Sequence, residues 1–482
     1  MPTARSSPEL SRPEVARALA DVGHLLRFRR ATLRRPRAVG LALAGLGAVT
    51  LAAAVLPALL VPGDELDRFV RPALAAVVLV AVIGAIAAGG GRELLARDPA
   101  SVLPISPVTD HLGALLLAPL SAGWLIQAWG LLGLVSAVAG PGGTPVALAW
   151  LVAVTALAQA VGWAGEQLRR RGTLAWLSAP LAGLGLLPAP LVADAIGAGP
   201  PTLVFAVLAL LGATALLVAA GGVLAVATAR LVPRDEARRE TATYAPRPLP
   251  ASDLALLRRT DRASVWRSVP LRRGTALLAL APGSVALAGA LAWSSLVLLP
   301  GLVASGCVLL FGVNLWCLDG RGMLWRESLP VAPRTVLLAR ALVLAEVLLG
   351  AGTATLILGA IRAGRPTTAE LLAVVLALLV VVAQSLSAAL RWSHAHPYAV
   401  DLRSARATPA PPLAMVGYSL RLAVATTLSG LLLAGFAGVG RADLVALSAA
   451  LLLAVSAVRI VRAARRWSDP VRRAAVVAVV AA

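Results

Sequence analysis

The chain has 482 residues, of which 59% are apolar or aromatic and 14% are charged, and its mean hydropathy is +0.84. Soluble domains carry about 25% charged residues, so this composition excludes an ordinary soluble domain, and its hydrophobicity excludes a disordered chain. The formal net charge of +21 rests on arginine alone, because the sequence contains no lysine. The arginines stand in short clusters between long apolar runs, which indicates the cytoplasmic edges of a membrane protein rather than a nucleic-acid-binding surface.

The N-terminal segment, residues 1–37, is polar and contains several arginines, which is not the pattern of a signal peptide. Ser11 and Glu14 have the spacing of a capping box, and apolar residues recur on one face of a helix that we expect over 11–30. Such a helix suits the inner headgroup region of a membrane. A solvated tail is the alternative. The apolar face consists of Val15, Leu19, Val22 and Leu26, and it is flanked by Arg17, Arg27 and Arg30.

The apolar runs predict an all-α polytopic membrane protein with about twelve transmembrane helices, because one crossing needs about 20 apolar residues. Two long runs in the first half, 38–229, are each divided by a breaker: 112–165, which is uncharged, at 140–143, and 173–229, whose one charged residue is Asp194, at 199–201. The second half, 275–460, ends in the shortest segment. The expected crossings are 38–63, 72–91, 112–139, 144–165, 173–192, 202–229, two within 275–318, then 336–361, 371–390, 420–440 and 444–458.

The distribution of arginine predicts a multi-pass protein of the cell membrane with both termini in the cytoplasm. Most arginines lie at the termini and in the connections that follow even-numbered helices. The cytoplasmic segments would then be 1–37, a proline-rich linker at 230–274 and a tail at 461–482. The few arginines in the opposite connections are Arg68, Arg71, Arg362, Arg365 and Arg441.

The two halves contain similar loops, LLARDPASVLPISPVT at 94–109 and MLWRESLPVAPRT at 323–335. Their prolines match at an offset of 226 residues, and further matches lie elsewhere in the halves. We therefore predict a duplication. An even number of helices in each half makes the two six-helix repeats parallel. The matched positions include Pro104 with Pro330, Pro107 with Pro333 and Gln159 with Gln384.

The sequence lacks the residues of a nucleotide-hydrolysing site. A P-loop needs a lysine that reaches the phosphates, and there is none here, so any ATP must be bound by a separate subunit. Cys307 and Cys317 do not share a helix face, and His394 and His396 have no further ligands near them in sequence. We therefore expect no cofactor, metal site or enzymatic activity in this chain.

The repeated loops are the strongest functional signal. Each lies on the predicted cytoplasmic side, between the second and third helices of its half. Pro107 can open a helix with Ser106 as its N-cap, and Pro333 matches it, although Ala332 cannot cap by its side chain. An arginine–acid pair precedes each turn. The loop residues are Arg97, Asp98, Pro104, Ser106, Pro107 and Thr109 in the first half and Arg326, Glu327, Pro330, Pro333 and Thr335 in the second.

These loops resemble the coupling loop of ABC-2 type exporter permeases, in which a similar proline motif follows the second of six helices. The resemblance implies that the loops dock an ATPase, in two copies, and that an amphipathic helix precedes the first crossing. That family usually assembles two six-helix chains, whereas here both halves lie in one chain. The alternative is that the loops are ordinary connections.

Three further groups of polar residues stand out. Glu346 lies about ten residues into the ninth helix, about 15 Å deep, where it is either a functional carboxylate or one neutralised by protonation or a neighbouring helix. Gln159 and Gln384 are expected to hold helices together. We interpret the outer acidic turn as solvated. That turn contains Asp64, Glu65 and Asp67.

The sequence thus favours the membrane-spanning permease subunit of an ATP-driven exporter, whose partners are an ATPase, the lipid bilayer and an unidentified exported substrate. The first alternative is a proton-coupled secondary transporter that uses Glu346. The second is a polytopic membrane enzyme, which is disfavoured because the outer loops are too short to hold the carboxylates or histidines of an active site.

Overall fold

The computed structural model describes residues 12–31, 36–60, 63, 66–87, 105–120, 122–173, 175–231, 248–400, 402 and 408–482. Every regular element in these ranges is a helix, so the described chain is all-α. The chain divides into two compact units, Met1–Asp235 and Glu236–Ala482. Their boundary falls within 230–274, the segment expected to link the two halves.

The first unit has helices in all six of its predicted crossings. The fifth segment is broken into three short helices, because Pro180 and Pro188 lack the amide hydrogen that an α-helix needs. The elements are α1 (Arg12–Ala31), α2 (Pro36–Leu60), η1 (Asp67–Phe69), α3 (Val70–Ala87), α5 (Pro107–Leu117), η2 (Ala118–Leu120), α6 (Ala122–Ala139), η3 (Pro141–Gly143), α7 (Thr144–Arg170), η4 (Ala175–Ala182), α8 (Gly183–Leu186), α9 (Ala189–Ile196) and α10 (Pro200–Ala229).

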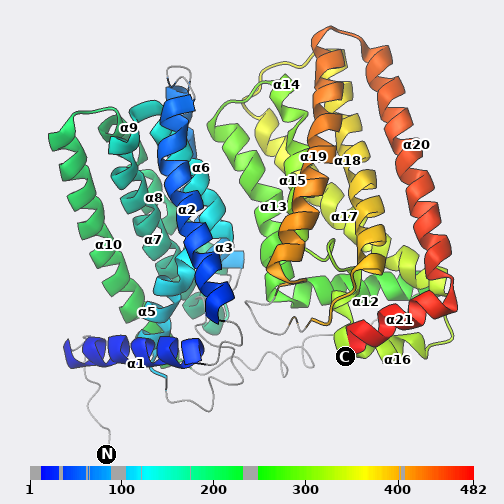
Figure 1. Cartoon of the computed structure of the whole chain (residues 1–482), viewed down its shortest axis with the longest axis horizontal. Coiled ribbons are helices and arrows are strands. Elements are labelled where there is room, and N and C mark those ends of the chain that lie inside the picture. Colours follow the sequence, from blue (N-terminus) through cyan, green and yellow to red (C-terminus); the bar gives the residue numbers. More distant parts are fainter. Residues whose placement is uncertain are drawn as a thin grey trace, which may run out of the picture. The chain divides into compact units, whose positions relative to one another are not determined.

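The core of the first unit centres on α7, whose residues are buried on nearly every side. It packs most extensively on α10, while α2 packs mainly on α6. Trp150 of α7 donates from Nε1 to the carbonyl oxygen of Leu74 in α3 at 3.2 Å. Figure 1 shows α1 lying across the ends of these helices, where it contacts α5.

The second unit contains α12 (Asp253–Arg267), α13 (Val269–Ala288), α14 (Trp293–Leu296), α15 (Leu299–Ser305), η5 (Gly306–Leu309), η6 (Leu315–Leu318), η7 (Gly320–Gly322), α16 (Met323–Glu327), α17 (Pro333–Ala360), α18 (Thr368–Ala395), α19 (Pro412–Gly438), α20 (Ala442–Trp467) and α21 (Pro470–Ala481). Several of these helices lie in, or extend into, segments where the sequence indicated no crossing. The expected linker contains α12 and the start of α13. The last crossing is 26 residues long, about 39 Å, and the expected tail contains α21.

The long helices of the second unit stand side by side, and α12, α16 and α21 lie at one end of them (Figure 1). The most extensive contacts are those of α18 with α20 and of α13 with α17. Thr367 and Glu370 form a full capping box at the start of α18, which fixes where that helix begins.

Seven helices in the described part of the chain are long and apolar enough to cross a membrane. Four shorter apolar helical stretches accompany them. Several long apolar helices of this kind indicate a membrane protein. The seven are Leu43–Leu60, Pro141–Arg170, Pro200–Ala229, Pro333–Ala360, Thr368–Ala395, Ala414–Gly438 and Ala442–Trp467. The count of twelve crossings stays a prediction.

Candidate functional site

Only the C-terminal end of the first proline loop, from residue 105 onward, belongs to the described structure. Arg97, Asp98 and Pro104 lie outside the described residues. Ser106 caps α5 as expected: its Oγ accepts a hydrogen bond from the backbone N–H of Thr109 at 3.0 Å, and Pro107 is the first helical residue. The side chain of Thr109 donates to Asp21 of α1 at 3.3 Å. The start of α5 is therefore bound to the helix that lies across it.

α5 is also anchored from its other side, through a buried histidine that sequence reasoning missed. Trp163 of α7 donates from Nε1 to Nδ1 of His111 at 3.2 Å, so Nε2 of the same ring donates to the carbonyl oxygen of Val218 in α10, 3.1 Å away. The ring lies against Gly221, where an added Cβ would be 2.5 Å from His111 Cε1. These contacts join α5 to α7 and α10.

The second proline loop begins with the short helix α16 and ends where Pro333 opens α17. Ala332 makes no side-chain cap, as expected. Met323 and Arg326 of α16 are buried, whereas Leu324 and Trp325 are exposed, Trp325 by 72%. One side of α16 therefore faces the unit, and the other presents two large apolar side chains to the surroundings.

Arg326 belongs to a buried network of two arginines and two aspartates. Its Nη1 donates to Asp261 of α12 at 3.0 Å and to Asp319 at 2.5 Å. Arg340 of α17, which is fully buried, donates to both carboxylates at distances of 2.8 to 3.1 Å. The formal charges cancel. The network joins α12, the segment before α16, α16 itself and α17.

The aromatic residues beside this network extend it to the end of α20. Arg340 also donates to the carbonyl oxygen of Leu315 at 2.5 Å, and its guanidinium lies 5.9 Å from the centre of the Trp316 ring. Trp316 stacks on Trp467 with ring centres 4.1 Å apart. Trp467 in turn donates to the carbonyl oxygen of Pro333 at 3.1 Å. The last turn of α20 is therefore bound to the first turn of α17.

Glu327 points to α21 rather than to α12. Its carboxylate accepts a hydrogen bond from Nε of Arg473 at 2.5 Å. Arg334, in the first turn of α17, donates to Ser468 in the turn between α20 and α21 at 3.1 Å. Both residues of the arginine–acid pair in this loop are thus used in ion pairs within the unit: Arg326 pairs with Asp261 and Asp319, and Glu327 pairs with Arg473.

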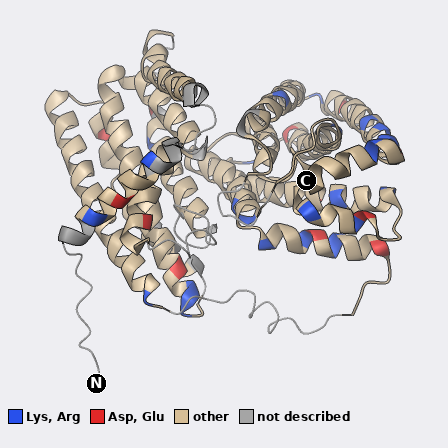
Figure 2. Ribbon diagram, turned by 60° about the horizontal axis from the view of Figure 1, so that its bottom comes forward, with Lys and Arg blue, Asp and Glu red and all other residues tan. Residues whose placement is uncertain are grey.

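Charged residues of the second unit gather at the end where α12 and α21 lie, as Figure 2 shows. Glu346 of α17 takes part in this arrangement. Its carboxylate pairs with Arg258 and, at 2.6 Å, with Arg262, both on α12. The hydrogen bond to Glu346 raises the pKa of Arg262 above its ordinary value. Glu346 therefore has cationic partners from a neighbouring helix, which was one of the two interpretations open from sequence.

The two glutamines differ in their contacts. Gln384 of α18 donates to Ser429 of α19 at 2.8 Å, which confirms the expected link between helices. Gln159 is buried in α7, and its Nε2 has no hydrogen-bond partner among the described residues. His394 is partly buried, and it stacks on Trp467 with ring centres 5.2 Å apart. In the described ranges no three His, Cys, Asp or Glu side chains gather to hold a metal ion.

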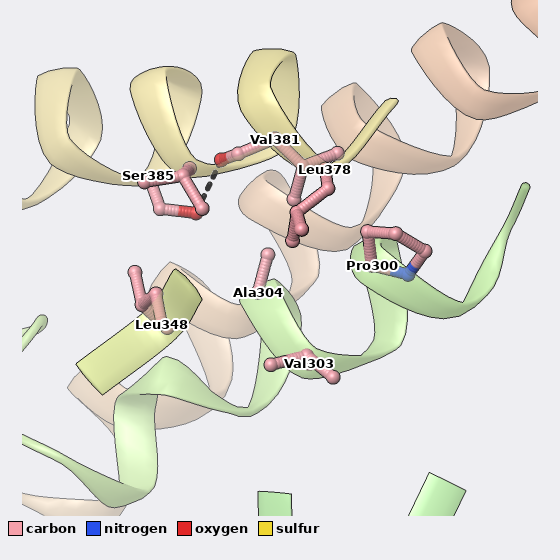
Figure 3. A pocket seen from close by; sticks show the side chains of 8 residues that line it. Pro300, Val303, Ala304, Leu348, Leu378, Val381 and Ser385 are labelled. Carbon is pink, nitrogen blue, oxygen red and sulfur yellow. Dashed lines mark hydrogen bonds between the residues drawn. The ribbon is translucent and has the colours of Figure 1, made fainter. Parts of the chain in front are cut away.

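A narrow apolar crevice lies between α15, α17 and α18 (Figure 3). Its one hydroxyl, that of Ser385, is already bonded to the carbonyl oxygen of Val381 at 2.7 Å. The crevice therefore offers no free polar group to orient a ligand. It is lined by Pro300, Val303, Ala304, Leu348, Leu378, Val381, Val382 and Ser385.

Each unit thus has one candidate site of its own, a helix start that is opened by a proline and bonded to a neighbouring helix. No family model matches the chain, and neither a curated protein nor a solved structure is similar to it.

Proposed function

We propose that the chain is the membrane-spanning permease subunit of an ATP-driven exporter of the ABC-2 type, energised by a separate ATPase that docks on its two proline loops. The observation that carries this proposal is the bonding at the helix starts. Asp21 of α1 bonds the first turn of α5, and Asp261 of α12 bonds Arg340 of α17. A force applied to the first loop would reach the long helices α7 and α10 through His111 of α5. A force applied to the second loop would reach α17 through Arg326 and Asp261.

The same pairs of helices pack together in both units, which supports two parallel six-helix repeats. The first predicted crossing packs on the third, as α2 on α6 and α13 on α17. The fourth packs on the sixth, as α7 on α10 and α18 on α20. The helix before the first crossing contacts the start of the third segment in each unit. A duplicated chain would present two equivalent loops to a dimeric ATPase.

The proposal is tested by measuring whether the chain binds a candidate ATPase. The first candidate is an ATPase with Walker motifs that is encoded by an adjacent gene. Because Arg326 and Glu327 are used inside the unit, the exposed residues of α16 are the better targets. Trp325→Ala should weaken co-purification of the ATPase at least tenfold, since exposed aromatic residues are frequent anchors of interfaces. The matched control is Trp266→Ala, which changes an exposed tryptophan on a different helix, α12.

Equal recovery of the ATPase with both variants, or failure of any ATPase to bind the unaltered chain, would count against the proposal. The two outcomes differ in meaning. The first removes α16 as the contact, whereas the second removes the ATP-driven exporter itself.

The proton-coupled alternative depends on Glu346. Its ion pairs with Arg258 and Arg262 weigh against a carboxylate that exchanges protons during transport. Once a substrate is found, we expect the Glu346→Gln variant to transport it. The rate of transport should respond to an imposed pH gradient in the same way in the variant and in the unaltered protein. Loss of a pH-gradient dependence that the unaltered protein shows would instead favour the secondary transporter.

Twelve crossings with both termini in the cytoplasm are proposed from the arginine distribution and are tested by cysteine labelling. Cys307 and Cys317 are buried and are first replaced. An impermeant thiol reagent on intact cells should then label a cysteine at Gly142 or Ala198 and spare one at Ala237. Labelling at position 237 from outside would invert the scheme.

A further inference from the structure

The end of α20 that leads into α21 carries four arginines within eight residues, Arg459, Arg462, Arg465 and Arg466. All four are exposed, and none has an ion-pair partner among the residues that the structure describes. The neighbouring arginines of α21 differ, because each pairs with a carboxylate. Arg472 pairs with Asp469 at 3.3 Å, and Arg473 with Glu327 at 2.5 Å.

These arginines continue an exposed apolar stripe of the same helix. Arg462 lies four residues after Val458 and seven after Val455, so all three share one face. Val458, Val455 and, one turn further back, Leu451 are about half exposed or more. α20 is a candidate crossing of which only 17% of the apolar window is buried. One face therefore passes from exposed hydrocarbon to exposed guanidinium groups.

Like charges three and four residues apart on a helix repel each other. The only acidic residue of α20, Asp443, stands at the opposite end of the helix and is paired with Arg441 at 2.6 Å. The arginine cluster therefore calls for an anion from outside the described chain. An occupant with a phosphate and a hydrocarbon tail would satisfy both parts of the face, because arginine binds phosphate oxygens through two parallel hydrogen bonds.

Among the described residues, the end of the equivalent helix in the first unit carries one matching arginine. LAVATARLV at 224–232 matches LAVSAVRIV at 453–461, which aligns Arg230 with Arg459. α10 ends at Ala229, one residue before its arginine, whereas α20 continues to Trp467. The extra two turns carry the other three arginines of the cluster.

We propose that the arginine cluster of α20 binds the phosphate headgroup of an anionic phospholipid whose acyl chains lie along the apolar stripe above it. The proposal depends on the chain spanning a membrane and not on its coupling to an ATPase. It assigns a lipid to one named face of one helix, with the headgroup at Arg459, Arg462 and Arg466 and the tails at Val455 and Val458.

The test uses the intact chain, purified in detergent and supplied with phosphatidylglycerol or with phosphatidylcholine, and bound lipid is measured by native mass spectrometry. The triple variant Arg459→Gln, Arg462→Gln, Arg466→Gln should lose phosphatidylglycerol binding by about a hundredfold, from about fivefold for each arginine near an anionic surface. The control variant, which removes as many charges from the other end of the unit, changes Arg362, Arg365 and Arg441 to Gln and should keep wild-type binding.

A second triple variant, Arg459→Lys, Arg462→Lys, Arg466→Lys, keeps the charges and should bind phosphatidylglycerol more tightly than the glutamine variant, so loss of the charges is distinguished from loss of the fold. Equal retention of phosphatidylglycerol by the triple variant and the control overturns the proposal. So does displacement of the lipid by inorganic phosphate alone, which would mark a site for free phosphate. Unchanged lipid binding with loss of ATPase co-purification would assign the cluster to a protein partner instead.

Discussion

Replacement of Asp261 by asparagine tests whether charge balance in the buried network holds the second unit together. The side chains of Asp261 and Arg340 are almost completely buried, at 2% and 0% exposure. Asp261→Asn leaves two arginines facing the single carboxylate of Asp319, a net buried charge of +1. Removing one partner of a buried ion pair costs about 3–5 kcal/mol, because the charge left behind is neither solvated nor paired.

This cost should be visible in thermal unfolding of the purified protein. For a domain of about 150–250 residues, each kcal/mol shifts the midpoint by about 2–4 °C, so we expect a decrease of about 6–20 °C. The assay is the loss of monodisperse protein on heating, measured by fluorescence-detected gel filtration. Asp253→Asn, at an exposed aspartate in the first turn of the same helix, is the matched control and should shift the midpoint little.

A double variant separates charge balance from the loss of individual hydrogen bonds. Asp261→Leu with Arg340→Met leaves Arg326 paired with Asp319 and restores neutrality. It should unfold at a higher temperature than Asp261→Asn, although one more residue of the network is gone, since apolar groups can replace a buried pair at little cost. The reasoning is refuted if Asp261→Asn unfolds within about 3 °C of the unaltered protein, or if the double variant is the less stable of the two.

Two further predictions concern the first unit. Ser106→Ala removes the N-cap of α5 and should destabilise the unit by about 1 kcal/mol, measured as a lower unfolding midpoint, and an unchanged midpoint would mean that the cap is not needed. Gly221→Ala places a Cβ against the ring of His111, which two hydrogen bonds hold in place, and should cost about 1–3 kcal/mol by the same assay. Gly212→Ala, in the same helix with open space around it, is its control, and equal midpoints for the two would contradict the packing argument.

The parts of this chain that its sequence determines are those governed by local patterns. Apolar runs and breakers located the long helices, because helix length and the conformational limits of Gly and Pro act over neighbouring residues. The cap at Ser106 and the missing cap at Ala332 followed from residue type alone. α12 was also within reach: Ser252 caps it, and its buried residues Leu257 and Val265 have helical spacing.

Tertiary structure decided which of the singled-out charges are exposed. Arg326 had been grouped with its neighbour Glu327, but its partners are Asp261, 65 residues away, and Asp319. Arg340 pairs with Asp261 across 79 residues. A helical period fixes which residues share a face, yet it carries no information about which helix that face meets. The partners of a buried charge are set when distant segments pack, because only then does its removal from water require a counter-charge.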